Sequence, residues 1–357
     1  MLTDDFFQLL RYSLGVTENY PEMMDEGWQN MYDTAKKQSL LGIVLHGIIK
    51  LPSDCQPPRK IKLNWIMQGD KIATNNANVD KVAVKVSEAF GKKKSRCCIL
   101  KGQGNAMMYP QPKLRMPGDV DIWVLASPKK VISFARKSMP TAKAEYHHID
   151  FCPVNGIHVE LHYRPSFMNN LICNYRLQKW FSEKVVEQCS NYVELADGVG
   201  KIPVPTDSFN RIFQMAHISN HVMHEGIGLR QLLDYYFLLQ RGFSADERQA
   251  DERLLRRFGL YKVASAVMYV LKEVFGLADD KMIVAPDDKR GRFLLDEILL
   301  SGNFGQYDER LKNSKSQTSK NVQRLKRDLR FMRYFPSECL WEPVFRWYHF
   351  FWRLRYN

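Results

Sequence analysis

Long hydrophobic runs are absent from this sequence of 357 residues. No window approaches the stretch of about 18 uninterrupted apolar residues that a membrane-spanning helix needs. The opening MLTDDFFQLL also lacks the basic residues of a secretion signal and carries Asp4 and Asp5 instead. We therefore expect a cytoplasmic protein with no stable membrane insertion.

Cysteine is sparse and unpatterned. The seven cysteines form an odd set, and no two of them show C-x-x-C spacing. This pattern argues against both a disulfide framework and a structural zinc site. We expect reduced thiols that mostly pack in the interior. No internal repeat is visible.

Acidic residues are outnumbered, because 39 Asp and Glu against 52 Lys and Arg give a formal net charge of +13. Such an excess attracts polyanions, including nucleotides, RNA and acidic membrane surfaces, without choosing among them. Basic residues cluster at 92–96 and again on a predicted helix between residues 320 and 333. A solvated charged face is the simpler explanation of the second cluster, and nucleic-acid contact is the alternative.

The hydrophobic period divides the chain into three regions. Apolar residues recur at helical spacing in residues 1–92 and 206–357, whereas residues 93–205 contain runs that alternate with period two. The sequence therefore predicts an α+β protein, with a small β-sheet core flanked by N-terminal and C-terminal helical regions. The expected strands are CCILK, VDIWVLA, YHHIDFCPV and IHVELHY.

Two aspartates interrupt one of these strands, in the string MPGDVDIWV. Alternate residues of a strand share a face, so Asp119 and Asp121 point one way while Val120 and Ile122 point the other. Two carboxylates this close need a cation or hydrogen-bond donors. A structural alternative stays open, in which Asp119 caps a turn and Asp121 faces solvent on an edge strand.

The string PVNGIH predicts a β-hairpin, because Asn-Gly suits the positive φ angles of a two-residue turn. Continuous pairing from this turn places Asp150 opposite Leu161 on the core face and Glu160 on the polar face beside His162. Three carboxylates can then converge on one side of the sheet: Asp119, Asp121 and Glu160. Such a set can hold one or two Mg²⁺ ions, as phosphoryl and nucleotidyl transfer require.

A phosphate-binding turn is indicated just upstream, in CCILKGQGNAMMYP. The strand runs into Lys101 and Gly102 and then into a short helix, where backbone N–H groups can approach a phosphate. Arg115 follows, a fixed cation suited to phosphate oxygens.

Three histidines share one face of a predicted helix, because His217, His221 and His224 are spaced i, i+4 and i+7. Packing between helices, lining of a nucleotide or acceptor cleft, and metal binding all remain open for this face.

The final seventeen residues, WEPVFRWYHFFWRLRYN, are rich in aromatics. The rings surround the predicted helix, which favours burial between neighbours or a contact in an oligomer over a membrane surface.

These strings together resemble a known family. LKG, a short helix ending in Tyr-Pro, an arginine, then G-D-V-D and, some forty residues later, V-E-L-H are similar to uncharacterised bacterial nucleotidyltransferases of the DNA polymerase β superfamily. The downstream GLRQLLDYYFLLQ is similar to the helical part of that family. The resemblance implies a mixed-sheet core and a reaction in which a nucleoside monophosphate moves from an NTP to an acceptor.

The resemblance also implies roles for individual residues. Asp119, Asp121 and Glu160 are the expected catalytic residues and ligands of Mg²⁺ or Mn²⁺. The expected nucleotide-binding residues are Lys101, Gly102, Arg115 and Gly118. The expected cleft-lining residues are His162, His217, His221 and Arg230.

One position departs from the superfamily pattern, because Gln103 follows the turn glycine where serine or glycine is usual. The alternative function is therefore a catalytically impaired relative that binds nucleotide, RNA or a protein. The acceptor, whether a small molecule, RNA or protein, is not named by any motif.

Overall fold

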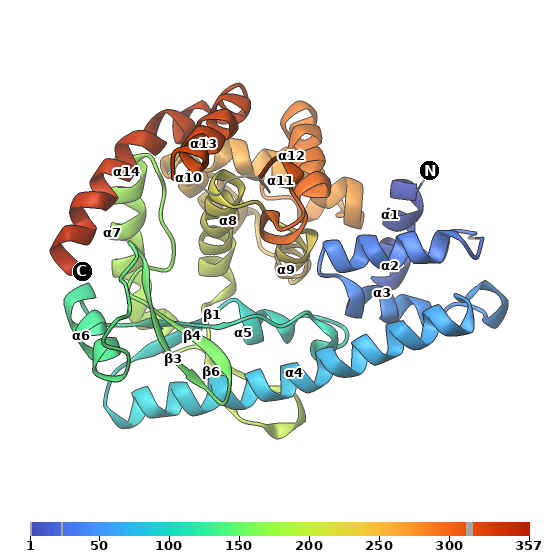
Figure 1. The fold of residues 1–357 in the computed structure, drawn as a ribbon, viewed down its shortest axis with the longest axis horizontal. Coiled ribbons are helices and arrows are strands. Elements are labelled where there is room, and N and C mark those ends of the chain that lie inside the picture. Colours follow the sequence, from blue (N-terminus) through green and yellow to red (C-terminus); the bar gives the residue numbers. More distant parts are fainter. Residues whose placement is uncertain (1, 23, 312–316) are drawn as a thin grey trace.

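The computed structural model describes residues 2–22, 24–311 and 317–357. Its centre is a four-stranded mixed sheet with the strand order β1-β2-β4-β3, in which β2 and β4 are parallel and the other neighbours are antiparallel (Figure 1). The strands are β1 Cys97–Leu100, β2 Val120–Val124, β3 His148–Val154 and β4 Ile157–His162, with a separate pair β5 Tyr192–Glu194 and β6 Lys201–Pro203. The α+β prediction is confirmed.

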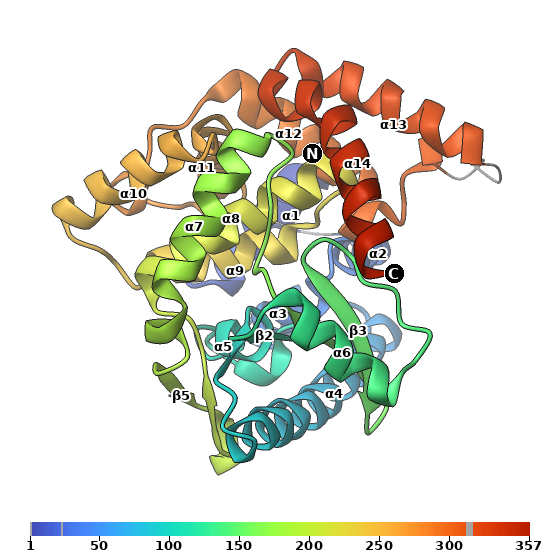
Figure 2. The ribbon, with the colours of Figure 1, turned by 90° about the vertical axis from the view of Figure 1, so that its left-hand side faces the viewer.

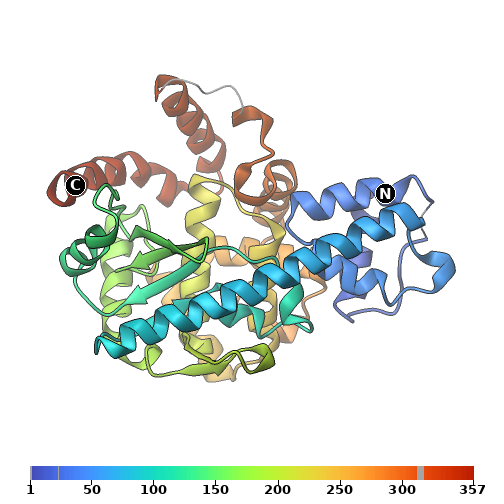
Figure 3. The ribbon, with the colours of Figure 1, turned by 60° about the horizontal axis from the view of Figure 1, so that its bottom comes forward.

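The N-terminal region is helical, as expected. Its helices are α1 Leu2–Ser13, α2 Gly27–Lys37, α3 Leu41–Ile48 and α4 Arg59–Lys92. Helix α4 begins directly after Pro57 and Pro58 and runs from the other N-terminal helices to the sheet (Figures 1 and 3).

Helix α4 connects two hydrophobic cores. Trp65 and Ile72 from its first half belong to the large helical core, whereas Val79 and Phe90 from its second half belong to the core of the sheet. One continuous helix thus joins the two regions, and the proposed domain boundary at residue 92 stays a prediction.

Alternation along the strands gives the sheet two different faces. Ile99, Ile122 and Leu161 point to the core shared with α4 and with α6 Pro128–Ser138. On the opposite face, the Trp123 ring lies 5.6 Å from Phe209, centroid to centroid. The polar residues of β2 and β4 lie on this second face beyond Trp123.

The hairpin between β3 and β4 differs from the prediction in how its two strands pair. Its turn is as expected, since Val154 pairs with Ile157 and both turn residues have positive φ. However, Phe151 pairs with Val159, so Cys152 and Pro153 together face the single residue His158. Proline cannot donate a ladder hydrogen bond and is commonly found at such bulges.

The bulge moves the rest of β3 by one residue. Asp150 therefore lies opposite Glu160, and Ile149 lies opposite Leu161. The predicted placement of Asp150 on the core face is wrong, because the pairing is not continuous. Asp150 is on the polar face, where its Oδ1 atom lies 3.4 Å from His158 Nε2 at the surface.

The C-terminal region is helical, and a long helix also follows the hairpin. The remaining helices are the short α5 Gly102–Ala106, then α7 Leu171–Gln188, α8 Asp207–His224, α9 Leu229–Gln240, α10 Ala245–Arg257, α11 Tyr261–Phe275, α12 Asp288–Ser301, α13 Gln317–Met332 and α14 Pro336–Tyr356. In the described parts of the chain, no helix has the length and apolarity needed to cross a membrane.

Helix α14 returns to the sheet, and its C-terminal end lies beside α6 and β3 (Figure 2). Arg136 of α6 donates a hydrogen bond of 2.7 Å to the Tyr356 carbonyl. Burial of the terminal aromatics is only partial. Phe345 and Trp352 join the core of the sheet, whereas Trp347 remains 66% exposed.

Candidate active site

One cleft of about 520 Å³ gathers the residues predicted to be catalytic, nucleotide-binding or cleft-lining. Its walls come from the polar face of the sheet, from α8 and α9, and from α13 and α14. This volume is within the usual range for small-molecule sites. The predicted residues that line it are Lys101, Gly102, Arg115, Gly118, Asp119, Asp121, Glu160, His162, His217, His221 and Arg230.

The carboxylates meet because of the strand register. Asp121 of β2 lies opposite Glu160 of β4 in the parallel pair, and Asp119 precedes Asp121 by two residues. Asp121 is 4% exposed, whereas Asp119 is open to the cleft. Glu160 can share a metal ion with Asp121 and His162, with Asp119 and His158, or with His148 and Asp150, because one ligand atom from each member of a set lies within 4.8 Å of the others.

Two cationic groups hold Asp121. Lys101 Nζ lies 3.0 Å from one carboxylate oxygen and His162 Nε2 lies 2.8 Å from the other. Burial acts to raise the Asp121 pKa, but Lys101 and His162 outweigh it and hold that pKa far below its ordinary value. The sequence-based expectation of a positive partner for the aspartate pair is met by these two residues.

The neighbouring groups respond to the same charges. The negative charge of Asp121 raises the pKa of Asp119 to about 6. Burial lowers the His162 pKa, but hydrogen bonds with Asp121 and Glu160 outweigh this effect and raise it to about 9. Burial acts to raise the Glu160 pKa, but the hydrogen bond with His162 brings this pKa below its ordinary value. The site is thus a tightly coupled set of charges.

The predicted turn lies beside this set. Lys101 follows β1 with a φ of 53°, Gly102 has a φ of 44°, and α5 begins at Gly102. Positive φ is rare for a residue with a side chain, and strained backbone of this kind clusters at functional sites. Gln103 donates a side-chain hydrogen bond to Asp80 of α4, so its amide group points away from the cleft.

Arg115 is not a free cation. Its Nε and Nη2 atoms donate hydrogen bonds of 2.8 and 2.7 Å to the two carboxylate oxygens of Asp234, and Tyr109 Oη donates to the same carboxylate at 2.6 Å. Arg115 and Asp234 are 2% and 4% exposed. This buried pair ties the segment before β2 to α9.

Arg230 is a second arginine of the cleft and, unlike Arg115, is not hydrogen-bonded to Asp234. It lies in the first turn of α9 and lines the cleft. Within the part of the chain that the structure describes, its guanidinium makes no hydrogen bond or ion pair. Burial and the neighbouring Arg115 lower the Arg230 pKa more than Asp234 and Asp119 raise it, so an anionic ligand would stabilise the charge of Arg230 at this helix N-terminus.

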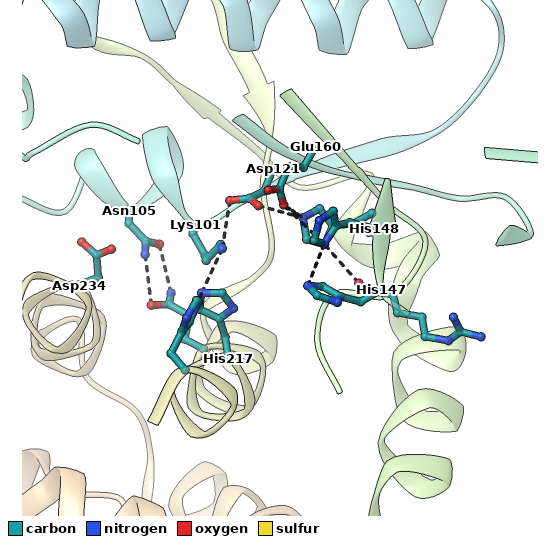
Figure 4. A network of polar contacts seen from close by, with 12 residues as sticks. Lys101, Asn105, Asp121, His147, His148, Glu160, His217 and Asp234 are labelled. Atoms are coloured by element: carbon teal, nitrogen blue, oxygen red, sulfur yellow. Dashed lines mark hydrogen bonds and ion pairs between the residues drawn. The ribbon is translucent and has the colours of Figure 1, made fainter. Parts of the chain in front are cut away.

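The histidines of α8 continue the polar network, as Figure 4 shows around Lys101 and His217. Lys101 Nζ lies 3.1 Å from His217 Nε2, which lies 3.0 Å from His221 Nε2. His221 Nδ1 lies 3.2 Å from Glu225. The shared helix face predicted from the i, i+4 spacing therefore lines the cleft.

Several cleft residues carry no sequence signal of their own. His147 and His148 read as strand residues with local partners, yet both line the cleft. Arg324, Arg327 and Arg346 reach it from α13 and α14, far along the chain. A basic cluster was visible around Arg324, but nothing in the sequence indicated which face of its helix lines the cleft.

The chain was compared with known proteins. A profile of the family described as "Uncharacterised nucleotidyltransferase" matches residues 24–276. Among solved structures, the chain is similar to an antigenic nucleotidyltransferase-like protein from Paracoccidioides brasiliensis, with 12% identity and a TM-score of 0.31 over 50% of this chain and 88% of that one. A similarity this low supports no argument. No curated protein matches the sequence.

Proposed function

Because this chain belongs to the uncharacterised nucleotidyltransferase family, we propose that it moves a nucleoside monophosphate from an NTP to an acceptor. The observation that carries the proposal is the register of β2 against β4, which sets Asp121 beside Glu160 on the face that opens to the cleft. The acceptor oxygen forms a bond to the α-phosphorus, the bond to the bridging oxygen breaks, and pyrophosphate leaves.

The donor set fits a hard divalent cation. Asp119, Asp121 and Glu160 supply carboxylate oxygens, the ligands that Mg²⁺ and Mn²⁺ prefer. Such ions would neutralise phosphate charge and orient the α-phosphate. NTP and Mg²⁺ are abundant in the cytoplasm, the compartment we propose for this protein.

The cations of the cleft suit the triphosphate. Lys101 lies at the turn before α5 with its ammonium beside Asp121, and Arg230 lies at the start of α9. Gly102 and Gly118 leave the approach to these positions free of side chains. Arg115 acts through Asp234 and fixes the backbone before β2, so we assign it a positioning role in nucleotide binding.

A proton must also leave the acceptor. Asp119 is the exposed member of the aspartate pair. Its carboxylate is therefore placed to accept the proton of an acceptor hydroxyl that enters along the cleft. Positioning and charge neutralisation then supply most of the rate enhancement.

A second candidate is an impaired relative that binds nucleotide, RNA or a protein. Two observations favour it: Lys101 and His162 already neutralise Asp121, and the Gln103 side chain is turned toward Asp80. A module of this kind would bind anions without metal and lose them with added salt.

The two candidates are separated by following an α-phosphate label from each NTP, with Mg²⁺ or Mn²⁺ and a cell extract as the source of acceptor. Transfer of label that requires metal and is lost in Asp121→Asn supports the enzyme. Metal-independent NTP binding that salt abolishes, with no transfer of label, supports the binding module.

A further inference from the structure

Imidazole groups are concentrated around the carboxylates. The cleft walls hold seven of the nine histidines of the chain. Carboxylates alone suffice for Mg²⁺, which prefers oxygen ligands, whereas imidazole suits borderline transition metals such as Zn²⁺. The nitrogen atoms nearest to Asp121 and Glu160 can therefore decide whether the cleft binds Mg²⁺ or a transition metal more tightly.

Two nitrogen atoms lie at ligand spacing from these carboxylates. His162 Nε2 is 2.8 Å from Asp121 Oδ1 and 3.2 Å from Glu160 Oε2. His148 Nδ1 is 3.7 Å from Glu160 Oε2. Ligand atoms bound at 2.0–2.2 Å to one cation lie about 2.9–3.6 Å from one another in octahedral or tetrahedral geometry. Asp121, Glu160 and His162 thus each place one ligand atom close enough to share one ion, and His148 adjoins this set through its contact with Glu160.

The groups behind these ligands orient them. His162 Nδ1 lies 3.3 Å from the Arg164 carbonyl, which directs Nε2 toward the carboxylates. A second hydrogen bond of this kind is the usual support of a metal-binding histidine. Lys101 holds Asp121 Oδ2 and leaves Oδ1 facing His162.

His147 supplies a further nitrogen at the same place. Its Nε2 lies 2.9 Å from His148 Nδ1, and one ring nitrogen from each of His147, His148 and His162 lies within 4.8 Å of the others. Among the described residues, the buried His147 Nδ1 has no hydrogen-bond partner. Figure 4 shows the His148 ring next to Glu160, and the His147 ring next to His148 on the side away from the carboxylates.

The histidine pair on α8 is a poorer place for a cation. His217 Nε2 faces the Lys101 ammonium at 3.1 Å, and among the described residues no carboxylate contacts His217 to offset the repulsion of a dication, as Asp121 does on the sheet side. Within the described part of the chain, the carboxylate that contacts this pair is that of Glu225, which lies against His221. The geometry therefore favours the sheet side of the cleft.

We propose that Asp121, Glu160, His148 and His162 form a mixed nitrogen and oxygen site that binds Zn²⁺ or a similar transition-metal ion more tightly than Mg²⁺. His147 lies close enough to be an additional ligand. The inference rests on the proposed function in so far as both use Asp121 and Glu160, and it assigns that site a metal preference.

The test uses the metal-free full chain and metals alone. Co²⁺ is the spectroscopic probe, since the intensity and position of its visible absorption depend on nitrogen ligation and coordination number, and Zn²⁺ is then added in competition in excess Mg²⁺. We expect one Co²⁺ per chain, displaced by one Zn²⁺. His148→Gln and His162→Gln should each weaken Zn²⁺ binding by about 10-fold or more.

The matched control is His349→Gln, a histidine of the same cleft that lies on α14 against Glu145 at 3.3 Å. It should leave the Co²⁺ spectrum and the Zn²⁺ affinity unchanged. Circular dichroism of each variant checks its fold, and His148→Asn serves if His148→Gln does not fold.

The inference is overturned if no Zn²⁺ binds in excess Mg²⁺, or if binding survives in folded His148 and His162 variants but is lost in His217→Gln. Zinc binding at the expected residues without any transfer of nucleotide would instead leave the inference standing and count against the proposed function. Mg²⁺-dependent transfer without zinc binding would support the proposed function and overturn the inference about zinc.

Discussion

Asp121 and Glu160 stand directly opposite each other in the parallel pair of β2 and β4, although a helix and a strand separate them in the sequence. Both carboxylates therefore project from the same face of the sheet. His162, the next residue but one on β4, bridges them through Nε2. The pairing of β2 with β4 therefore brings the Asp121, Glu160 and His162 side chains together on the polar face of the sheet.

The first prediction concerns the third carboxylate. Glu160→Gln should lower metal-dependent nucleotidyl transfer by more than about 100-fold, because a charged ligand contributes more than the supporting groups whose loss costs about 10–100-fold. Far-UV circular dichroism should be unchanged. The measurement is transfer of α-phosphate label under saturating metal.

Its matched control is Asp150→Asn on the same face of the hairpin. Asp150 pairs with His158 at the surface, where an ion pair contributes about 1 kcal/mol or less. Activity and stability should therefore stay close to those of the unmodified chain. Full activity in Glu160→Gln, or loss in Asp150→Asn alone, would contradict the assignment.

The second prediction concerns the buried pair of Arg115 and Asp234. Asp234→Ala leaves the guanidinium buried without a counter-charge, so the free energy of unfolding should fall by about 3–5 kcal/mol. Denaturant titration measures this change. Glu252→Ala, which breaks the exposed pair with Arg256, should leave the free energy of unfolding nearly unchanged. Equal effects in the two variants would show that the Asp234 contact is not a structural tether.

The third prediction concerns the pH dependence of stability. Burial raises the pKa of Glu338 to about 7 from an ordinary value of 4.5, although Asn169 and Asn170 donate backbone hydrogen bonds to it. The folded state holds this proton more tightly, so the stabilising contribution is complete below pH 4.5 and is lost as pH rises through 7.

Glu338→Gln should remove this dependence of the free energy of unfolding on pH. Thermal unfolding of both chains between about pH 5 and pH 8 should show a steeper loss of stability in the unmodified chain, by at most about 3 kcal/mol. Parallel curves for the two chains would refute the assignment of Glu338 to this pH window.

The fourth prediction concerns the thiols, all of which are free. Burial raises the pKa of Cys97 to about 12 and that of Cys189 to about 11, so few thiolates form near neutral pH. The other fully buried thiols are Cys98 and Cys339. A thiol reagent should therefore react rapidly with at most three of the seven cysteines in the folded chain, and with all seven in denaturant. Rapid reaction of more than three would contradict this burial.

The strands and the polar face were predictable because their signals are local. Alternation around Asp121 and Glu160 identifies which face each side chain takes, and the Asn-Gly turn fixes the start of the hairpin. The position of Asp150 was not predictable by this route, since a bulge at Pro153 breaks the continuous pairing. Proline within a predicted strand was the available warning.

Other parts of the site depend on contacts between distant segments. Arg115 suits a phosphate by its chemistry, but its partner Asp234 comes from a helix packed against it in the folded chain. Arg327 likewise reaches the cleft because α13 packs near the end of α8, where it donates a hydrogen bond to the Val222 carbonyl at 2.6 Å. Neither contact follows from local periodicity.

The most direct test of the central claim is a crystal structure of the full chain with Mn²⁺ and an NTP analogue whose bond between the α- and β-phosphates cannot be cleaved. The account predicts an anomalous manganese peak bounded by Asp119, Asp121 and Glu160, with the triphosphate between Lys101 and Arg230. A fully occupied analogue with its phosphates elsewhere, and no manganese at these carboxylates, would contradict it.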